Sequence, residues 1–377
     1  MTPQPRFSLC TIVRDEARHL ERCLASVRGV VDEVCVVDTG SSDGTPEIAE
    51  GLGARVVRVA WSEDFAAARN ASLAMARGEW ILVLDADEEL ASPDRARAQL
   101  EAFAGRWPGR AGRVRLTNVD GEGGRSSAAL TRILPNDGRH RFRGRIHEQV
   151  VRVEESGEKG RASEPLRADC ALEVLHHGYA AGEIERRSKL ERNVRLLERA
   201  LRDEPDDGYL WFQLGRTRAL ARDHAAALQA LERALERCPD GAAWGIQALE
   251  IGAGSLRALG HSQQAFELLG GVAAGVPDRA DTQFLLALLQ LDLGRLEGAE
   301  RGFLRCLELA GAPVGAAESD ASASSWAPAH NLGVMHECLG RTAEAERWYR
   351  RALELHPACR PSAEGLARLR AAAAEAS

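Results

Sequence analysis

The amino-acid sequence predicts two parts of different fold class: an α/β domain built on a parallel sheet, and then a domain made of helices alone. Over residues 7–85, short apolar runs alternate with segments of helical spacing, which is typical of strand–helix–strand units with right-handed crossovers. After residue 183 the strand signals stop and a helical pattern repeats. The chain has 377 residues, enough for two domains of about 150 residues each. We therefore predict domains over residues 1–182 and 183–377.

The first 90 residues supply strands and helices in alternation. We predict strands over 7–13, 31–38, 54–59 and 79–85, and helices over 19–27, 44–53 and 64–78. The second helix has Thr45 as its N-cap candidate, Pro46 at its first position and Gly53 just past its end, which are typical helix start and stop signals. Parallel sheets bind ligands outside the carboxyl ends of their strands. We therefore expect Asp38 and the acidic segment 85–89 to lie at that edge.

Residues 110–175 have a different pattern, with short β-like runs separated by Gly-rich turns. The runs are "GRVRLTN", "AALTRIL", "IHEQVVRV" and "CALEVLHH". We interpret them as the second, mixed half of the same domain. The polar segment 154–165 is predicted to be a loop.

The helical part contains an internal repeat, the signature of stacked helical units. Two copies match step for step: Leu214, Ala227, Leu231, Ala234 and Pro239, and then Leu332, Ala345, Tyr349, Ala352 and Pro357. This is the tetratricopeptide pattern, in which small residues lie where two helices touch. Weaker copies carry Ala265, Leu269 and Pro277, and then Leu286, Ala287, Ala299 and Phe303, while Asn193, Ala200 and Pro205 fit a degenerate leading unit. We expect an insertion within 311–325 and a capping helix over 361–376.

The composition disfavours several classes of partner and site. The net charge is -7, whereas a general nucleic-acid binder carries concentrated positive charge, so we expect no nucleic-acid partner. The sequence has neither a membrane-spanning apolar run nor a signal-peptide pattern, and we expect a cytoplasmic protein. The eight cysteines are scattered and form no CxxC pair. This predicts reduced thiols, with neither a disulfide framework nor a zinc site.

A cluster of carboxylates follows an apolar strand in "WILVLDADEEL". Asp85, Asp87, Glu88 and Glu89 lie within five positions, and like charges this close raise each other's pKa. If the segment stays extended, Asp85 and Asp87 point to different sides, so that one can hold a hard cation such as Mg²⁺ or Mn²⁺ while the other accepts from a hydroxyl. The alternative is a solvated acidic strand end.

Two further features accompany these carboxylates. Asp38 opens "DTGSSDGT", a Gly-rich turn before a helix, which can offer N–H groups to an anion or can be a plain connection. Arg69 lies in the helix before the acidic strand and is either a phosphate-binding residue or an ordinary surface arginine.

Four motifs in order carry a family resemblance: "SLCTIVRDEARHLERCLASV", "VDEVCVVDTGSSDGT", "WSEDFAAARNASL" and "WILVLDADEEL". Together they resemble the family 2 glycosyltransferases, whose domain has the nucleotide-diphospho-sugar transferase (GT-A, Rossmann-like) fold. The resemblance covers about residues 7–180. The helical part resembles the subset of that family with tetratricopeptide repeats. The expected fold is thus an α/β GT-A domain followed by an all-α tetratricopeptide-repeat solenoid.

The resemblance implies an inverting transfer of a hexosyl or N-acetylhexosaminyl group from a nucleotide-sugar, usually a UDP-sugar, assisted by Mg²⁺ or Mn²⁺. "LDADEE" matches the family's DxD motif, so that Asp87 holds the metal and Asp85 contacts the ribose, or the metal through water. Asp38 matches the position that contacts the nucleotide base, and Arg69 the basic residue near the nucleotide. The donor-binding residues at the exit of the first strand would be Thr11, Arg14 and Glu16.

The resemblance also suggests a catalytic base. An inverting transfer needs a carboxylate that removes the proton of the acceptor, and "FRGRIHEQV" resembles a G-x-I-H-E stretch of the repeat-bearing subset, which selects Glu148. The alternative is that His147 and Glu148 end a strand and pair with arginines. "VLHHGY" resembles an H-x-G-Y stretch, in which His176 would complete the metal shell or bind the diphosphate. The alternative is an ordinary buried histidine.

Three functions follow from these patterns. The leading one is a glycosyltransferase whose repeat domain holds the acceptor, which could be a peptide, a protein or a glycan. The second is a non-catalytic tetratricopeptide scaffold with a degenerate transferase domain. The third is a nucleotidyltransferase, which also joins an α/β sheet to acidic metal ligands. The retained Asp38, Arg69, Asp85 and Asp87 favour the first over the second, and the "VDTGSSDGT" turn favours it over the third.

Overall fold

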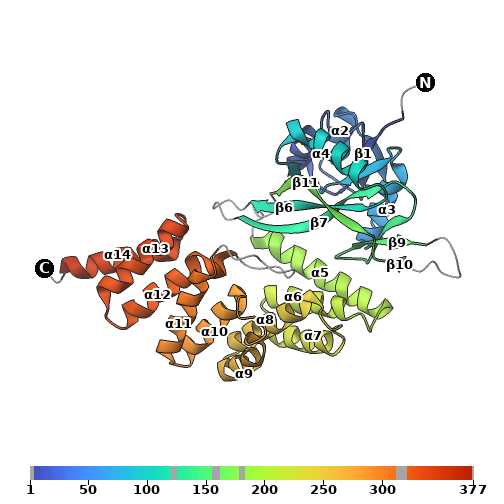
Figure 1. The fold of residues 1–377 in the computed structure, drawn as a ribbon. Coiled ribbons are helices and arrows are strands. Elements are labelled where there is room, and N and C mark those ends of the chain that lie inside the picture. Colours follow the sequence, from blue (N-terminus) through green and yellow to red (C-terminus); the bar gives the residue numbers. More distant parts are fainter. Residues whose placement is uncertain (1–3, 120–124, 155–161, 178–182, 311–320, 376–377) are drawn as a thin grey trace. The chain divides into compact units, whose positions relative to one another are not determined.

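The computed structural model describes residues 4–119, 125–154, 162–177, 183–310 and 321–375 (Figure 1). The chain forms two compact units, the first ending at Glu185 and the second beginning at Arg186. The first unit contains the strands, and the second contains only helices in its described part. In the described part of the chain, no helix is long and apolar enough to cross a membrane.

The first unit is built on a mixed sheet of eight strands in the order β3-β2-β1-β4-β7-β6-β11-β5. The first four strands pair in parallel, and β7 joins β4 and β6 antiparallel, as the sequence predicted for the two halves of the domain. The strands are β1 (Phe7–Val13), β2 (Glu33–Asp38), β3 (Arg55–Arg58), β4 (Trp80–Val83), β5 (Glu88–Leu90), β6 (Ala111–Val119), β7 (Arg125–Pro135) and β11 (Arg167–His176).

Alternate side chains of the central strands pack on opposite faces of the sheet. Leu9 and Leu82 join a core with the helices α1 (Ala17–Ser26), α2 (Thr45–Gly51) and α4 (Pro93–Arg106). Cys10 and Ile81 join a second core, which includes residues of α3 (Phe65–Met75), β8 (His140–Arg143) and β9 (Gln149–Val153). The strand β10 (Ala162–Ser163) completes the small sheet of β8 and β9. This burial on both faces is typical of parallel sheets.

Two local predictions were wrong. Thr45 is not the N-cap of α2 but lies inside it, after Gly44, because Asp43 accepts hydrogen bonds from the Thr45 N–H and hydroxyl and so draws the helix start back. The predicted strand 79–85 ends at Val83. The chain then turns, with the Glu88 N–H donating to the Asp85 carbonyl at 3.0 Å. Asp85 and Asp87 therefore do not alternate along an extended strand.

The helix α5 (Glu183–Asp203) starts just before the second unit, which continues as helix pairs capped by α14 (Arg360–Glu375). The pairs are α6 (Gly208–Leu220) with α7 (His224–Glu236), α8 (Ala243–Ala258) with α9 (Ser262–Ala273), α10 (Ala280–Asp292) with α11 (Leu296–Glu308), and α12 (Trp326–Cys338) with α13 (Thr342–Leu355). The predicted contact residues Ala227, Ala265, Ala299 and Ala345 are all fully buried. This confirms the repeat register. Residues 311–320 of the predicted insertion lie outside the described residues.

The eight cysteines are all free thiols, as the sequence predicted.

Candidate active site

The predicted site residues gather at the carboxyl ends of the parallel strands. Asp38 is the last residue of β2 and pairs in register with Val13 at the end of β1. The Leu84 N–H, just after β4, donates to the carbonyl of Cys10 in β1 at 3.4 Å, so Asp85 follows at the same edge. Strand ends of this kind form the crevice in which open α/β sheets bind their ligands.

Asp38 is 2% exposed, and its carboxylate accepts from the N–H groups of Gly40 and Ser41 at 3.1 and 3.2 Å. Gly40 has φ +105, a backbone conformation that only glycine adopts readily. The Ser42 N–H donates to Asp15 at 2.7 Å. The N–H groups of Gly40, Ser41 and Ser42, which the sequence suggested as an anion site, therefore donate to carboxylates of the chain itself.

Asp15 connects the loops that follow β1 and β2. Its carboxylate accepts from Ser42, and its own N–H donates to the Ser41 hydroxyl at 2.9 Å. The next N–H, of Glu16, donates to the Thr45 hydroxyl at 2.8 Å. These bonds give Asp15 a structural part in shaping the strand exit.

The other donor-binding candidates differ in exposure. Thr11 is fully buried within β1, while the Arg14 side chain is about half exposed beyond the strand end. The donor contacts expected of Thr11, Arg14 and Glu16 stay predictions.

A chain of buried ion pairs links the remaining candidates. Arg69 Nη2 donates to Asp85 Oδ1 at 2.7 Å, and Arg69 Nε donates to Glu148 Oε1 at 2.5 Å. Arg132 Nη2 donates to Asp85 Oδ2 at 3.0 Å and also to Glu88 Oε1. Arg69 and Arg132 are each 7% exposed, and Glu88 is 2% exposed. Each oxygen of Asp85 thus has its own guanidinium partner.

This arrangement shifts the titration of the buried acids. Burial would raise the pKa of Asp85, but the guanidinium groups of Arg69 and Arg132 outweigh it and hold that pKa well below its usual range. For Glu88 the balance is reversed. Burial raises the pKa of Glu88 to about 7, and the charge of Asp85 adds to the rise although Arg132 opposes it. Two carboxylates three positions apart therefore have opposite shifts.

Asp87 and His176 form a separate pair beside this chain. His176 Nε2 lies 3.1 Å from Asp87 Oδ2, and His176 Nδ1 lies 2.8 Å from Asn118 Oδ1. Because an amide oxygen and a carboxylate oxygen both accept, Nδ1 donates to Asn118 and Nε2 donates to Asp87. The hydrogen bond to Asp87 raises the pKa of His176, although burial opposes it. The neighbouring His177 contacts Glu89 instead, at 2.8 Å.

Comparison with known proteins gives the first unit a family. The model of glycosyl transferase family 2 matches residues 8–131, and tetratricopeptide-repeat models match residues 186–242 and 327–359. The chain carries a family 2 glycosyltransferase domain followed by tetratricopeptide repeats. This confirms both the recognised family and the predicted fold class.

Relatives of the chain include proteins of both kinds. A TPR repeat-containing protein of Synechococcus elongatus is 38% identical over 234 residues, which are 62% of this chain and 57% of that protein. The glycosyltransferase SunS of Bacillus subtilis is 26% identical over 238 residues, 61% of this chain and 53% of SunS. An uncharacterized glycosyltransferase of Rickettsia bellii is 41% identical over 85 residues, 22% of this chain and 29% of that protein. The chain thus spans little more than half the length of the first two relatives.

Among solved structures, a thermophilic TPR protein of Thermus thermophilus is similar to 48% of this chain and 91% of its own, with 21% identity and a TM-score of 0.39.

Three residues of the transferase site were missed by sequence reasoning. Arg132 lies beside the buried Ile133 and Leu134 of β7, and a charged residue flanked by apolar strand residues signals a buried pair. Glu88 belongs to the acidic segment, but its burial has no local signal. Asn118 faces His176 because β6 and β11 pair in that register, and this pairing cannot be read from one strand alone.

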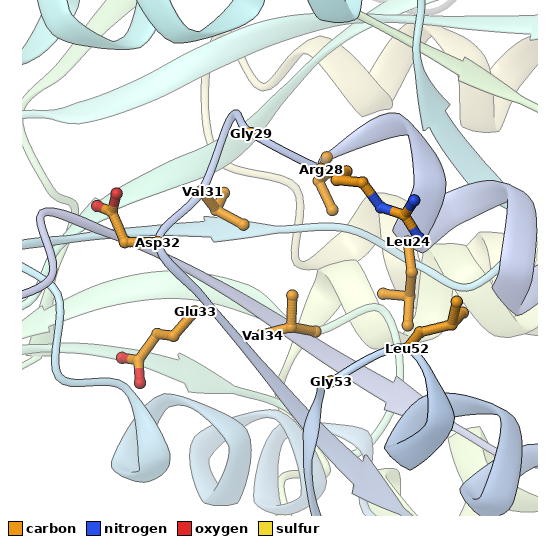
Figure 2. Close-up of a pocket in the computed structure, with 10 residues that line it drawn as sticks. Leu24, Arg28, Gly29, Val31, Asp32, Glu33, Val34, Leu52 and Gly53 are labelled. Carbon is orange, nitrogen blue, oxygen red and sulfur yellow. The ribbon is translucent and has the colours of Figure 1, made fainter.

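One cavity of the transferase domain lies away from this site. Figure 2 shows it around the start of β2, where it has a volume of about 190 Å³ and is lined by residues including Leu24, Arg28, Asp32 and Gly53. Asp38 ends the same strand. The cavity is therefore at the amino end of β2, opposite the edge that holds the acidic residues.

Proposed function

We propose that this protein is an inverting glycosyltransferase that moves a sugar from a nucleotide-sugar, most simply a UDP-sugar, to an acceptor held by the repeats. The observation that carries the proposal is the pairing of Asp85 and Glu148 through the buried Arg69, at the carboxyl edge of the sheet in a family 2 domain. Similarity to SunS, which is named a glycosyltransferase, supports the reaction class.

Asp87 and His176 are the residues that would hold a divalent cation. Two neighbouring ligands of an octahedral Mg²⁺ ion, each about 2.1 Å from it, lie about 3 Å apart, and the facing atoms of Asp87 and His176 are 3.1 Å apart. A bound cation would replace the proton on Nε2 of His176, while Asn118 keeps the other proton on Nδ1. In the described residues no cluster of three or more such side chains forms a metal site; a bound diphosphate and water would supply the remaining ligands. Mg²⁺ or Mn²⁺ would neutralise the charge of the leaving diphosphate.

Asp85 is held away from direct metal binding. Its two carboxylate oxygens accept from Arg69 and Arg132, and the positive charges of these two guanidinium groups oppose a cation bound at the same oxygens. This favours the role in which Asp85 contacts the ribose, or the metal through water. We propose that Asp38 contacts the nucleotide base, as the family resemblance implies.

Glu148 is proposed as the catalytic base. Arg69 binds Oε1 at 2.5 Å, which fixes the carboxylate in one orientation, and Oε2 has no hydrogen bond among the described residues. In the reaction the acceptor oxygen forms a bond to the anomeric carbon, the bond from that carbon to the diphosphate breaks, and Oε2 takes the acceptor proton.

The test is turnover of the full-length protein against a panel of nucleotide-sugars with Mn²⁺, using Glu148→Gln beside wild type. We expect one donor to be consumed and Glu148→Gln to lower kcat by about 10² or more, with nucleotide affinity changed by less than about threefold. Glu164→Gln is the matched control, because that side chain is 82% exposed. If Glu148→Gln turns over like wild type, the base lies elsewhere. If no donor is consumed, the repeats carry the function.

A further inference from the structure

The repeat unit contains a cavity beside its first helix pair. Side chains of α5, α6 and α7 enclose a volume of about 460 Å³. Its floor is apolar, formed by the buried Leu201, Leu214 and Ala230. Trp211 forms one wall and is fixed there by its indole N–H, which donates to the Pro205 carbonyl at 2.8 Å. A volume of this size is within the usual range for ligand pockets.

The other repeats have different residues at the position of Ala230. The helix pairs align on the residue of positive φ that ends each first helix, namely Arg222, Gly260, Gly294 and Gly340. In this alignment Ala230 corresponds to Leu268 in the second pair and Trp348 in the fourth. In the third pair it corresponds to Gly302, where an added Cβ would lie 2.8 Å from Ala287. Ala230 and Trp211 both line the cavity of the first pair.

The rim of the cavity carries arginines that differ in their partners. Arg218 is neutralised by Glu198 and Asp223. Arg202 and Arg233 also line the cavity, and in the described part of the chain neither has a carboxylate within ion-pair distance. The Arg233 guanidinium instead lies over the Trp211 ring, 4.7 Å from its centroid. The local field at this rim is therefore positive although the whole chain carries a net charge of -7.

Repeat alignment explains why Arg233 has no ion pair. Its equivalents Arg305 and Arg351 each pair with a glutamate three positions later, Glu308 and Glu354. Glu236 occupies that position here, but it pairs with Arg237 at 2.9 Å. Because Glu236 pairs with Arg237, the charge of Arg233 is left without that ion pair at the edge of the cavity.

We propose that this cavity binds an acidic peptide segment of a partner protein, which places an aliphatic or aromatic side chain on the apolar floor and flanking carboxylates on Arg202 and Arg233. Arginine binds carboxylates in a fixed fork geometry, and an apolar anchor in a pocket with charges at its rim is the usual anatomy of a recognition site. Every lining residue belongs to the repeat unit, so binding does not depend on the proposed sugar transfer.

The experiment measures binding of a fluorescein-labelled peptide of alternating glutamate and leucine to the full-length protein by fluorescence anisotropy, without nucleotide or metal. A peptide with lysine in place of glutamate is the charge control. We expect the acidic peptide to bind, the lysine peptide to bind at least about tenfold more weakly, and added salt to weaken the binding.

Two variants locate the peptide. Arg233→Glu reverses an exposed charge, and Ala230→Trp introduces the residue that the fourth pair carries at this position, Trp348. Each should weaken binding by about tenfold or more. Arg351→Glu is the matched control at the equivalent repeat position and should change binding less than about twofold. Circular dichroism checks the fold of Ala230→Trp, and Arg233→Glu, at an exposed position, decides the question if that variant unfolds.

Three results would overturn the proposal: no binding of the acidic peptide, equal binding of the lysine peptide, or equal weakening by Arg351→Glu and Arg233→Glu. Competition by phosphatidylserine vesicles but not by unlabelled acidic peptide would also overturn it, because the ligand would then be a lipid surface. None of these readouts involves donor turnover, so they are independent of the transferase test.

Discussion

The two units bury different kinds of side chain. At the strand ends of the transferase domain, the buried groups include Arg69, Arg132 and Glu88. Along the repeats, the fully buried positions that recur are alanines, from Ala227 to Ala345. Burying charge is unfavourable unless each group is paired, whereas alanine only brings two helices close together. The first domain thus holds paired charged side chains that a reaction could use. The alanines of the repeats contribute to helix packing alone.

The repeat unit also has a largely buried ion pair, with side chains 12% and 11% exposed, which sharpens the difference. Arg279 binds both oxygens of Glu250 at 2.8 Å, and Thr282 donates to the same carboxylate. This closed pair joins α8 to α10, with each carboxylate oxygen satisfied. The chain of Arg132, Asp85, Arg69 and Glu148 instead ends at a carboxylate with one oxygen available. In the Arg279–Glu250 pair both carboxylate oxygens are bonded, whereas Glu148 has one oxygen bonded to Arg69 and one that could accept a proton.

The largest expected effect is the loss of Arg132. Arg132→Met leaves Glu88 buried without its cation and Asp85 with a single partner, so the free energy of unfolding should fall by about 3–5 kcal/mol. Urea denaturation measures it. Arg113→Met is the control, because that exposed arginine pairs with an exposed Asp169 and should cost less than about 1 kcal/mol. If both substitutions lower the free energy of unfolding equally, the ion pairs of Arg132 stabilise the protein no more than an exposed ion pair does.

The second prediction is that the stability of the repeats depends on the size of the side chains buried between their helices. A Cβ at Gly333 would lie 2.6 Å from the Tyr349 ring, so Gly333→Ala should lower the free energy of unfolding by about 1–3 kcal/mol through overpacking. Gly254→Ala in α8 meets no atom within 4 Å and should stabilise the helix by about 0.5–1 kcal/mol. Thermal unfolding of the two variants compares them directly. A stable Gly333→Ala protein would show that the space between the helices tolerates expansion.

The third prediction concerns the orientation of His176. Asn118→Leu removes the acceptor that fixes the Nδ1 proton, so the affinity for Mn²⁺ in the presence of UDP should fall by about 10–100-fold. Asn118→Asp keeps an acceptor oxygen at that place and should retain more of the affinity than leucine does. Electron paramagnetic resonance of Mn²⁺ reports this without turnover. If Asn118→Leu leaves the affinity for Mn²⁺ unchanged, Asn118 does not orient His176 for metal binding.

The smallest expected effect is a pH dependence away from the site. Burial would raise the pKa of Asp32, but the N–H groups of Phe7 and Arg6 and the guanidinium of Arg97 lower it. A depressed folded-state pKa contributes stability that is present above the unfolded value, about 3.9, and is lost as the pH falls below it. Asp32→Asn should therefore lower stability at pH 6 by less than about 1 kcal/mol, because the group is partly exposed. In urea melts, the gap between the two proteins should narrow as the pH falls through the lowered folded-state pKa of Asp32; a constant gap would refute the linkage.

The sequence predicted the helical unit in more detail than it predicted the site of the first domain. The repeats were read at the level of single residues, because each buried alanine recurs in copies that check one another. The strands of the first half and their parallel direction also followed from local alternation, but their order in the sheet did not. The ionic chain did not, because Arg69, Asp85, Arg132 and Glu148 come from four separate segments and meet only in the folded sheet. The turn at Asp87 was missed because it depends on Glu88 entering the core to meet Arg132.

The central claim is that the acidic edge of the sheet binds a metal–nucleotide complex. Isothermal titration of UDP into the full-length protein, with and without Mn²⁺, tests it most directly, using Asp87→Asn beside Asp94→Asn, an exposed aspartate of α4. We predict Mn²⁺-dependent binding that Asp87→Asn weakens by at least about tenfold and Asp94→Asn leaves unchanged. Binding that is independent of Mn²⁺ and equally strong in both variants would contradict the claim.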